Sequence, residues 1–284
     1  MKTRFQILSV LALLPLVLYA QPVTPAVSAN ELVRAAVANE QKHASDPVYM
    51  VFRQRTEKPK GTVVKQIIET PQGMIGRLLL INDQPLTAEQ RRQDDERINR
   101  LLDPEKMREK RTEQTKDAQR VKNMIDALAD AFNYQYEGTA PGPNGKTYTR
   151  LKFTPNPNFD PPSRETAVLQ GMNGVMLVDA NSKRIARIDG TLFRDVTFGW
   201  GLLARLQSGG KLTVVQQEIL PGHWEITDLK LDLLGKALLL KTVKIQQTQK
   251  YTDFSRVPDN LSVAQAIDLL KKRESVVAEK RPAQ

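Results

Sequence analysis

The spacing of hydrophobic residues changes along this chain, and the first change separates a helix from a group of strands. Residues 30–44 repeat apolar side chains every three to four positions, which predicts an amphipathic helix. Its apolar positions are Leu32, Val33, Ala36 and Val37. Asp46-Pro47 predicts the end of this helix, because proline disfavours helical backbone in the residue before it. Apolar and polar residues then alternate over 48–55, 62–69 and 74–81, which is typical of an antiparallel meander.

A long charged segment follows, from residue 87 to residue 122. Thr87 and Gln90 have the spacing of a capping box, and Asp103-Pro104 has the form of an N-cap followed by proline, so two consecutive helices are expected. The second helix gains an apolar face only near its end, at Val121, Met124, Ile125, Leu128 and Phe132. We expect the charged part to be solvated and held by ion pairs between residues four apart. We expect the acidic pair Asp94-Asp95 to be solvated as well.

The charged segment also allows a second interpretation, as a surface that binds a polyanion such as nucleic acid. Acidic residues alternate with its lysines and arginines, and their carboxylates would repel phosphates. A solvated helical arm is therefore the favoured interpretation, and no nucleic acid is expected as a partner.

The second half of the chain is dominated by strand patterns between turn residues. Loops are predicted at 139–146 and at 155–162, and the second of these contains four prolines. A strand is predicted between the loops, over 148–154, and a helical turn after them, at 166–172. Turns are predicted at Asp189-Gly190, Gly209-Gly210, Pro221-Gly222 and Gly235. The strands predicted around these turns are 175–178, 183–188, 193–200, 201–207, 211–219, 224–234, 237–247 and 250–254. Ser262 and Gln265 form a second capping box, which starts a helix that reaches about residue 277.

These elements predict an α+β fold. We expect a large curled antiparallel sheet, in the form of an unclosed β-barrel, with helices covering one face and a charged helical insertion. The predicted domain covers residues 30–258 and contains the insertion at 87–132, and a C-terminal helix and tail follow at 259–284.

The apolar pattern shifts phase within the last strands. The apolar residues are at even-numbered positions before Asp228, as in Trp224 and Ile226, and at odd-numbered positions after it, as in Leu229 and Leu231. Such a slip predicts a bulge or bend that curls the sheet. Two interpretations remain open, an ordinary core beneath the C-terminal helix and a concave apolar trough that holds an acyl chain. The candidate ligand-binding residues of the trough are Phe198, Trp200, Trp224, Ile226, Leu229, Leu231, Leu238 and Leu240.

The first twenty residues have the layout of a secretory signal peptide. Lys2 and Arg4 precede an apolar run over 7–18, and cleavage is expected after Ala20, with a second candidate point after Ala29. The apolar run is shorter than the roughly 20 residues that span a bilayer. We therefore expect an exported protein, with an uncleaved N-terminal anchor as the alternative.

The residue inventory argues against catalysis. The sequence has no cysteine and two histidines, His43 and His223, which excludes thiol chemistry, thiolate metal sites and sites with several histidine ligands. A Ser-His-Asp triad would need one of these histidines, and no Gly-x-Ser-x-Gly motif supports it. The Gly-Lys pairs at 145–146 and 210–211 lack the other residues of a phosphate-binding loop. We expect no enzymatic activity, no catalytic residue, no cofactor and no metal site.

The cysteine content and the net charge indicate the cellular compartment and the class of partner that we expect. An exported chain without cysteine has no disulfides and is not acylated on a leader cysteine, which favours a bacterial periplasm or secretion from a bacterium. The formal net charge of +10 suits anionic partners such as lipid headgroups or lipopolysaccharide. The charges are spread along the chain, so an ordinary basic surface is the favoured interpretation.

The order of elements resembles a known superfamily. A leader, a helix, a meander, interposed helices and a second meander occur in this order, and the second meander contains Ile188-Asp189-Gly190-Thr191-Leu192 and Gly209-Gly210-Lys211-Leu212. Over about residues 30–254 this resembles the LolA/LolB-like periplasmic lipoprotein carriers, in particular the outer-membrane lipoprotein-sorting branch. The resemblance implies an unclosed barrel with a helical lid and a hydrophobic cavity for acyl chains. The charged segment at 87–122 departs from the compact carriers.

Two classes of function follow. The first is a periplasmic binding protein or carrier whose partners are lipids or acylated lipoproteins, involved in outer-membrane lipoprotein sorting or envelope lipid trafficking. Burial of an acyl chain would drive binding without covalent chemistry. The second is an envelope interaction or sensor protein whose charged helices bind a partner protein or the membrane surface.

Overall fold

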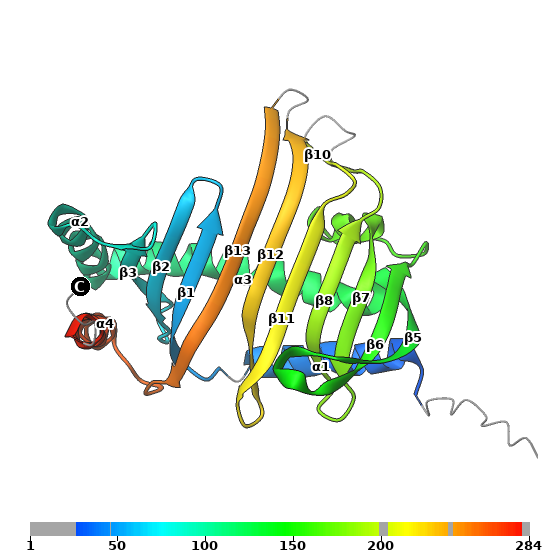
Figure 1. The fold of residues 1–284 in the computed structure, drawn as a ribbon, viewed down its shortest axis with the longest axis horizontal. Helices are drawn as coiled ribbons and strands as arrows, with labels where there is room; N and C mark the ends of the chain where they lie inside the picture. Colours follow the sequence, from blue (N-terminus) through cyan, green and yellow to red (C-terminus); the bar gives the residue numbers. More distant parts are fainter. Residues whose placement is uncertain (1–26, 46, 199–203, 238–240, 280–284) are drawn as a thin grey trace, which may run out of the picture.

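The computed structural model describes residues 27–45, 47–198, 204–237 and 241–279 (Figure 1). The predicted leader lies outside this range. The described chain forms one antiparallel sheet of 13 strands together with helices, and the sheet ends at the edge strands β4 and β5 without closing. The predicted α+β fold with a large unclosed antiparallel sheet is therefore confirmed.

The N-terminal elements follow the predicted order. The helix α1 spans Ala29–Ser45, and the meander consists of β1 (Met50–Lys58), β2 (Gly61–Ile68), β3 (Ile75–Ile81) and the short β4 (Gln84–Pro85). The charged segment then forms α2 (Ala88–Asn99), a 3-10 turn η1 (Arg100–Leu102) and α3 (Pro104–Ala131). Thr87 and Gln90 make both hydrogen bonds of the capping box, and the Asp103 side chain accepts the N–H of Glu105. Both predicted helix starts are therefore confirmed.

The second half of the chain supplies most of the sheet. Its elements begin with β5 (Phe132–Pro141), the 3-10 turn η2 (Pro143–Gly145), β6 (Thr147–Pro155), the 3-10 turn η3 (Thr166–Gly171), β7 (Met172–Asp179) and β8 (Arg184–Leu192). They continue with β9 (Val196–Phe198), β10 (Ala204–Leu206), β11 (Lys211–Leu220), β12 (His223–Ala237), β13 (Lys241–Arg256) and α4 (Val263–Glu279).

Strands from the two ends of the chain pair with each other in the sheet. It runs β4-β3-β2-β1-β13-β12-β11-β8-β7-β6-β5, with β10 pairing with β12 and β9 with β10. The N-terminal meander is therefore joined to the C-terminal strands through the β1–β13 pair. Strands β12 and β13, 15 and 16 residues long, extend beyond their neighbours at the end where β10 lies (Figure 1). We refer to this end of β10, β12 and β13 as the projecting ribbon.

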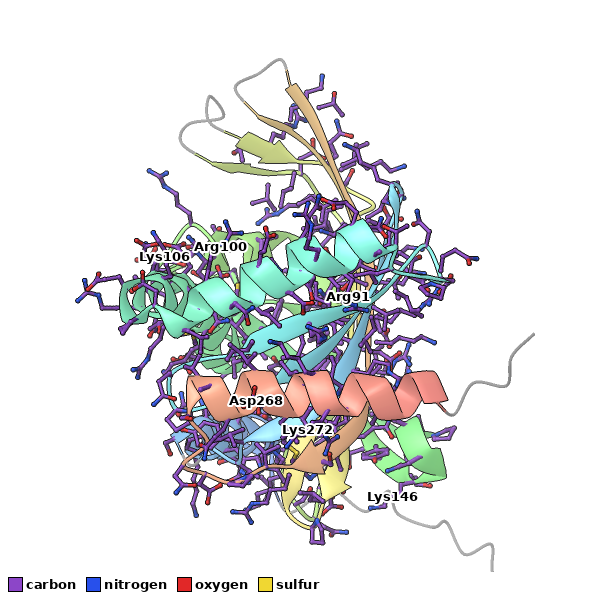
Figure 2. All side chains as sticks on the ribbon, turned by 90° about the vertical axis from the view of Figure 1, so that its left-hand side faces the viewer. Arg91, Arg100, Lys106, Lys146, Asp268 and Lys272 are labelled. Carbon is purple, nitrogen blue, oxygen red and sulfur yellow. The ribbon has the colours of Figure 1, made fainter. Side chains whose placement is uncertain are left out.

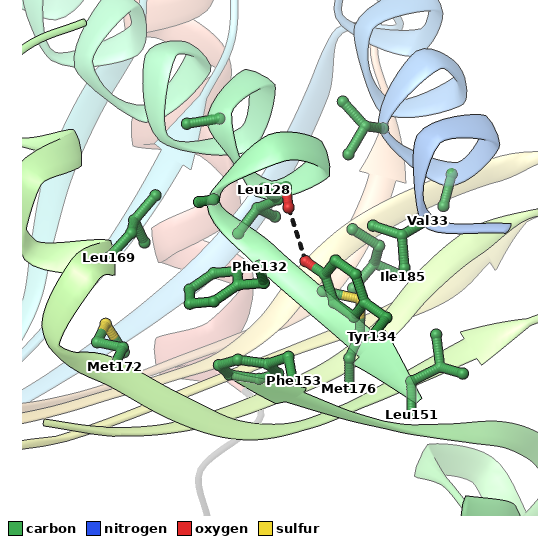
Figure 3. Close-up of a cluster of buried hydrophobic side chains, with 14 of the residues drawn as sticks. Val33, Leu128, Phe132, Tyr134, Leu151, Phe153, Leu169, Met172, Met176 and Ile185 are labelled. Atoms are coloured by element: carbon green, nitrogen blue, oxygen red, sulfur yellow. Dashed lines mark hydrogen bonds between the residues drawn. The ribbon is translucent and has the colours of Figure 1, made fainter. Parts of the chain in front are cut away.

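The main core lies where α1 and the end of α3 cover β5–β8. Its buried residues include Val33 of α1, Leu128 of α3, Phe132, Phe153 and Met176. Phe132 and Phe153 pack with ring centres 4.6 Å apart, and the Tyr134 hydroxyl donates a hydrogen bond of 2.8 Å to the Leu128 carbonyl (Figure 3). This bond satisfies a polar group inside an apolar cluster, where an unpaired hydroxyl would be costly.

A second core lies at the β1–β3 end of the sheet. Figure 2 shows α2 and α4 crossing this end of the sheet. The labels Arg91 and Arg100 mark the α2 segment, and Asp268 and Lys272 mark α4. The buried residues of this core come from β1–β3, α2, η1, the start of α3, the loop between β13 and α4, and α4. They are Val51, Ile68, Ile75, Ile98, Leu101, Met107, Val257, Leu261, Ala266, Ile267 and Leu270.

The first part of α3 is solvated, as predicted. Its ion pairs join residues three apart more often than four apart; they include Lys106–Glu109, Arg108–Glu105, Lys116–Glu113 and Arg120–Asp117. Val121 is 54% exposed and does not belong to the apolar face that we predicted for it. The helix ends one residue earlier than expected, because Phe132 has extended backbone angles and begins β5.

The prediction that Asp94 is solvated was wrong. Its side chain is fully buried where α2 meets the edge of β3. The carboxylate accepts hydrogen bonds from the N–H of Leu78 at 3.1 Å and from Arg97 at 2.7 and 3.0 Å. Asp94 therefore anchors the charged helix to the sheet.

Two of the predicted turns lie inside strands. β8 continues through Asp189-Gly190 to Leu192, and β12 continues through Gly235. Neither glycine is needed for a turn; each allows a close approach. A Cβ on Gly190 would lie 2.4 Å from the Met172 side chain, and one on Gly235 would lie 2.8 Å from the Arg205 carbonyl oxygen.

Candidate functional site

Two of the residues predicted to line an apolar trough, Leu229 and Leu231, lie two positions apart on β12. Leu229 and Leu231 are half-buried, and Leu231 lies directly opposite Leu212 of β11. Directly opposed residues of antiparallel strands point to the same face. Leu212 and Leu233 both pack against the main core. Leu229, Leu231 and Leu233 therefore lie on the face of the sheet that α1 and α3 cover.

These leucines continue the main core toward the projecting ribbon. Leu206 of β10 also packs against the main core, while Ile245 of β13, opposite Leu233, is 41% exposed. The apolar surface thus passes from closed core to solvent along two long strands. We call this surface the leucine track; its residues are Leu206, Leu212, Leu229, Leu231, Leu233 and Ile245.

Trp224 and Ile226 are the other predicted trough residues whose side chains the structure describes. Trp224 is buried in a separate cluster with Tyr148, Leu177 and Ala186. Ile226 is half-buried opposite Gln216, next to the irregularity in the β11–β12 pairing that the phase slip predicted. The backbone of Phe198 belongs to β9, but its side chain lies outside the described residues, as do Trp200, Leu238 and Leu240.

A cavity with ionisable side chains lies beside the end of α1, and sequence reasoning missed it. Its volume is about 380 Å³, and it is enclosed by the ends of α1 and β2, the start of β12 and the middle of α3. Both histidines of the chain line it, with ring centres 5.1 Å apart. Glu69 and Glu225 line it too, and Glu225 lies 2.8 Å from the Nε2 atom of His223.

A buried ion pair lies next to this cavity. Arg184 of β8 lies 2.9 Å from Glu40 of α1, and the two side chains are 7% and 8% exposed. Glu40 also accepts the N–H of Ile185 at 3.3 Å. The guanidinium carbon of Arg184 lies 5.9 Å from the ring centre of Trp224, within the range of a cation–π contact.

Burial changes the proton affinity of the carboxylates in this cavity. It raises the pKa of Glu69 to about 7, with a further increase from the nearby Glu225, while the hydrogen bond from the Met50 N–H opposes the rise. Burial also raises the pKa of Glu225 to about 7, where Arg184 opposes the rise and Glu40 adds to it. Burial lowers the pKa of His223, and the charge of Arg184 lowers it further. We refer to this set as the histidine–glutamate cavity.

The histidine–glutamate cavity can take up and release protons near neutral pH. Groups with perturbed pKa values in a cleft are candidates for function. Within the described part of the chain, no three or more His, Cys, Asp or Glu side chains are grouped so that they could hold a metal ion. Sequence reasoning treated the two histidines separately, because 180 positions separate them and no motif indicates that they meet.

Comparisons with known proteins give little further information. No family model matches the chain, and no curated protein matches it. One solved structure, a DUF1329 family protein from Desulfovibrio piger, is similar over 79% of this chain and 91% of that chain, with 11% sequence identity and a TM-score of 0.29. A likeness this remote says nothing about a ligand or an activity. Within the described residues, no helix has both the length and the hydrophobicity that a membrane crossing requires.

Proposed function

We propose that this protein is an exported, non-enzymatic binding protein that carries acyl chains of lipids or lipoproteins along the leucine track. The single observation behind this proposal is the continuity of the track. Leu206, Leu212 and Leu233 pack against the main core, whereas Ile245, at the projecting ribbon, is 41% exposed. An acyl chain would extend the closed core over this surface.

The energetics suit a carrier. Removing an acyl chain from water contributes about 0.8 kcal/mol per buried CH₂ group. Leu229, Leu231 and Leu212 are half-buried rather than closed off, so they retain apolar surface that a ligand would cover. No covalent step is required, which agrees with a sequence that has no cysteine and two histidines.

The sequence supports the cellular setting of the proposal. The leader-like first twenty residues favour export to a bacterial periplasm or secretion, and the order of elements resembles the LolA/LolB-like carriers. Outer-membrane lipoprotein sorting or envelope lipid trafficking is the process that this resemblance favours.

A variant within the track tests the proposal. Leu231→Glu places a carboxylate on the half-buried surface, where an unpaired charge beside an acyl chain is strongly unfavourable. We expect at least about tenfold weaker uptake of a fluorescent fatty acid, with the far-ultraviolet circular dichroism of the folded protein retained. Lys236→Glu is the matched control, because it adds a carboxylate at an exposed position of the same strand. Normal uptake by folded Leu231→Glu would show that the track is not the binding surface.

A second candidate function rests on the exposed part of α3. Residues 111–122 are exposed except for Gln114, and they offer charged side chains to a partner protein of the envelope. Deleting the charged segment would be a poor test, because Ile98 and Met107 belong to the second core. Reversing Glu113 and Lys116 together keeps their mutual attraction while changing the surface. Loss of partners in a pull-down, with normal lipid uptake, would favour the interaction function.

A further inference from the structure

A groove of about 770 Å³ lies on the other face of the sheet. Ile188 packs against the main core, so its strand neighbours Arg187 and Asp189 point to the opposite face. The floor comes from β6–β8 and β11–β13, and residues 140–143 at the β5–β6 turn form one wall. The charged residues of the groove are Arg150, Arg187, Asp189, Asp228, Lys230 and Lys250.

Arg187 is held in place by a carboxylate of its own strand. Its Nε and Nη2 atoms donate to Asp189 at 2.6 and 3.0 Å, and Asp189 also accepts the Thr213 hydroxyl at 2.9 Å. These contacts use one edge of the guanidinium, so the Nη1 edge remains for a ligand. A guanidinium fixed in this way loses less conformational entropy when it binds an anion.

Arg150 is arranged in a similar way. Its Nε atom donates to Glu137 at 3.1 Å, which leaves the N–H groups of its two terminal nitrogens for other acceptors. In the pairing of β6, β7 and β8, Arg150 lies opposite Leu177 and Leu177 lies opposite Arg187. The two arginines are therefore on one row of the sheet, separated by a single strand.

The charge of the groove favours an anion that also carries hydroxyl groups. Arg187 is paired with Asp189 and Arg150 with Glu137. Of the remaining charged lining residues, Lys230 and Lys250 outnumber Asp228, so the groove keeps a net positive charge. Thr213, Gln217 and Thr248 line the same space and can bond hydroxyl groups, while Asp228 can accept hydrogen bonds from them. The lining residues include no aromatic ring, so a nucleobase would find no stacking surface.

We propose that this groove binds a phosphate ester that carries neighbouring hydroxyl groups, such as a sugar phosphate or a glycerol phosphate. The phosphate lies between Arg150 and Arg187, and its hydroxyl groups are bonded by Asp228, Thr213 and Thr248. Paired arginine forks suit phosphate oxygens better than point charges do. The same chemistry occurs in free esters and in the headgroup of phosphatidylglycerol. Arg187 and Asp189 point away from the face that carries the leucine track, although Leu229 of the track also contributes to the lining of the groove. Phosphate binding here does not depend on acyl-chain binding.

Calorimetry with soluble probes tests the site. Glycerol 3-phosphate, glucose 6-phosphate and inorganic phosphate are titrated into the folded protein at low and at moderate salt. We expect the two esters to bind at least tenfold more tightly than inorganic phosphate, and their affinity to fall as salt rises. Arg187→Gln should weaken ester binding at least tenfold. Arg92→Gln, an exposed arginine on α2, should leave it unchanged and serves as the control.

Vesicles distinguish the two sources of the ester. Sedimentation with phosphatidylcholine vesicles that contain phosphatidylglycerol, against phosphatidylcholine alone, tests the headgroup. Binding of soluble esters without this vesicle preference identifies a soluble ligand, and a vesicle preference that Arg187→Gln removes identifies a lipid headgroup. Leu231→Glu should leave binding of the soluble esters intact. Absence of both kinds of binding, binding equal to that of inorganic phosphate, or full binding by folded Arg187→Gln would overturn the proposal.

Discussion

Glu40 of α1 and Arg184 of β8 form an ion pair that is almost completely shielded from water. The Nη2 and Oε2 atoms lie 2.9 Å apart, and the side chains are 8% and 7% exposed. Burial lowers the pKa of Arg184 and raises that of Glu40, so each charge depends on its partner. This pair fixes the first helix to the middle of the sheet, next to the histidine–glutamate cavity.

Removing one member of this pair should strongly destabilise the fold. Glu40→Ala leaves the buried Arg184 charge without its ion-pair partner, and the loss of one member of a buried pair typically costs about 3–5 kcal/mol. The free energy of unfolding in urea measures the loss. Asp130→Ala breaks the pair of Arg34 and Asp130, whose side chains are 58% and 70% exposed, and should cost less than about 1 kcal/mol. Equal losses in the two variants would refute the structural role of the buried pair.

Glu69 should make stability depend on pH near neutrality. Its pKa rises to about 7 on folding, so the stability that it contributes is present below pH 4.5 and is lost as pH rises toward 7. Glu69→Gln cannot ionise. The variant should therefore gain stability relative to the original protein between pH 5 and pH 8, by roughly 1–3 kcal/mol.

Urea unfolding at the two pH values measures this difference. Glu96→Gln, at an exposed position of α2, is the matched control. His223 acts in the opposite direction, because its pKa is lowered and its contribution is lost as pH falls below 6.5. It is present in both proteins, so its own effect largely cancels. A constant difference between pH 5 and pH 8 for Glu69→Gln would contradict the raised pKa.

Gly174 should tolerate no side chain. A Cβ at this position would lie 1.9 Å from the carbonyl oxygen of Asp189 and 2.8 Å from the Phe153 ring. Gly174→Ala should reduce stability by about 1–3 kcal/mol or more, because the backbone of β8 has to move. Gly76→Ala is the control, since the nearest atom would lie at 3.6 Å. Thermal unfolding followed by circular dichroism compares the two, and equal melting temperatures would show that β7 and β8 are less closely packed than described.

Asp94 should be the residue that attaches α2 to the sheet. Asp94→Ala removes the acceptor for the Leu78 N–H and for Arg97, and an unsatisfied buried group costs about 1–3 kcal/mol. Asp117→Ala removes an aspartate of α3 that is 72% exposed and should have little effect. Hydrogen exchange of the α2 amides offers a local measurement. Unchanged protection in Asp94→Ala would indicate that the second core alone holds the helix.

Much of the fold follows from local patterns in the sequence. The capping boxes at Thr87 and Ser262 and the proline after Asp103 fixed three helix starts, because each satisfies backbone groups within a few residues. The turns predicted at Gly190 and Gly235 were wrong, because a glycine inside a strand has no distinct local pattern. At Gly235 the glycine allows the Arg205 backbone to approach closely.

The candidate sites depend on contacts that local patterns do not contain. Asp94 is in a charged run, yet it is buried because the edge of β3 offers a backbone N–H. His43 and His223 meet only because β12 starts beside the end of α1. The phase slip correctly indicated an irregular pairing near Asp228, but it could not show that Trp224 would pack with Tyr148 instead of with Leu231.

The proposed carrier function is tested most directly by identifying what the protein holds when it is isolated from cells. The protein is purified from its cellular compartment without detergent, and its organic extract is analysed by mass spectrometry. We expect a phospholipid or acylated peptide in a fixed ratio to protein, and loss of this species in Leu231→Glu but not in Lys236→Glu. A lipid-free protein that also fails to take up a fluorescent fatty acid would contradict it.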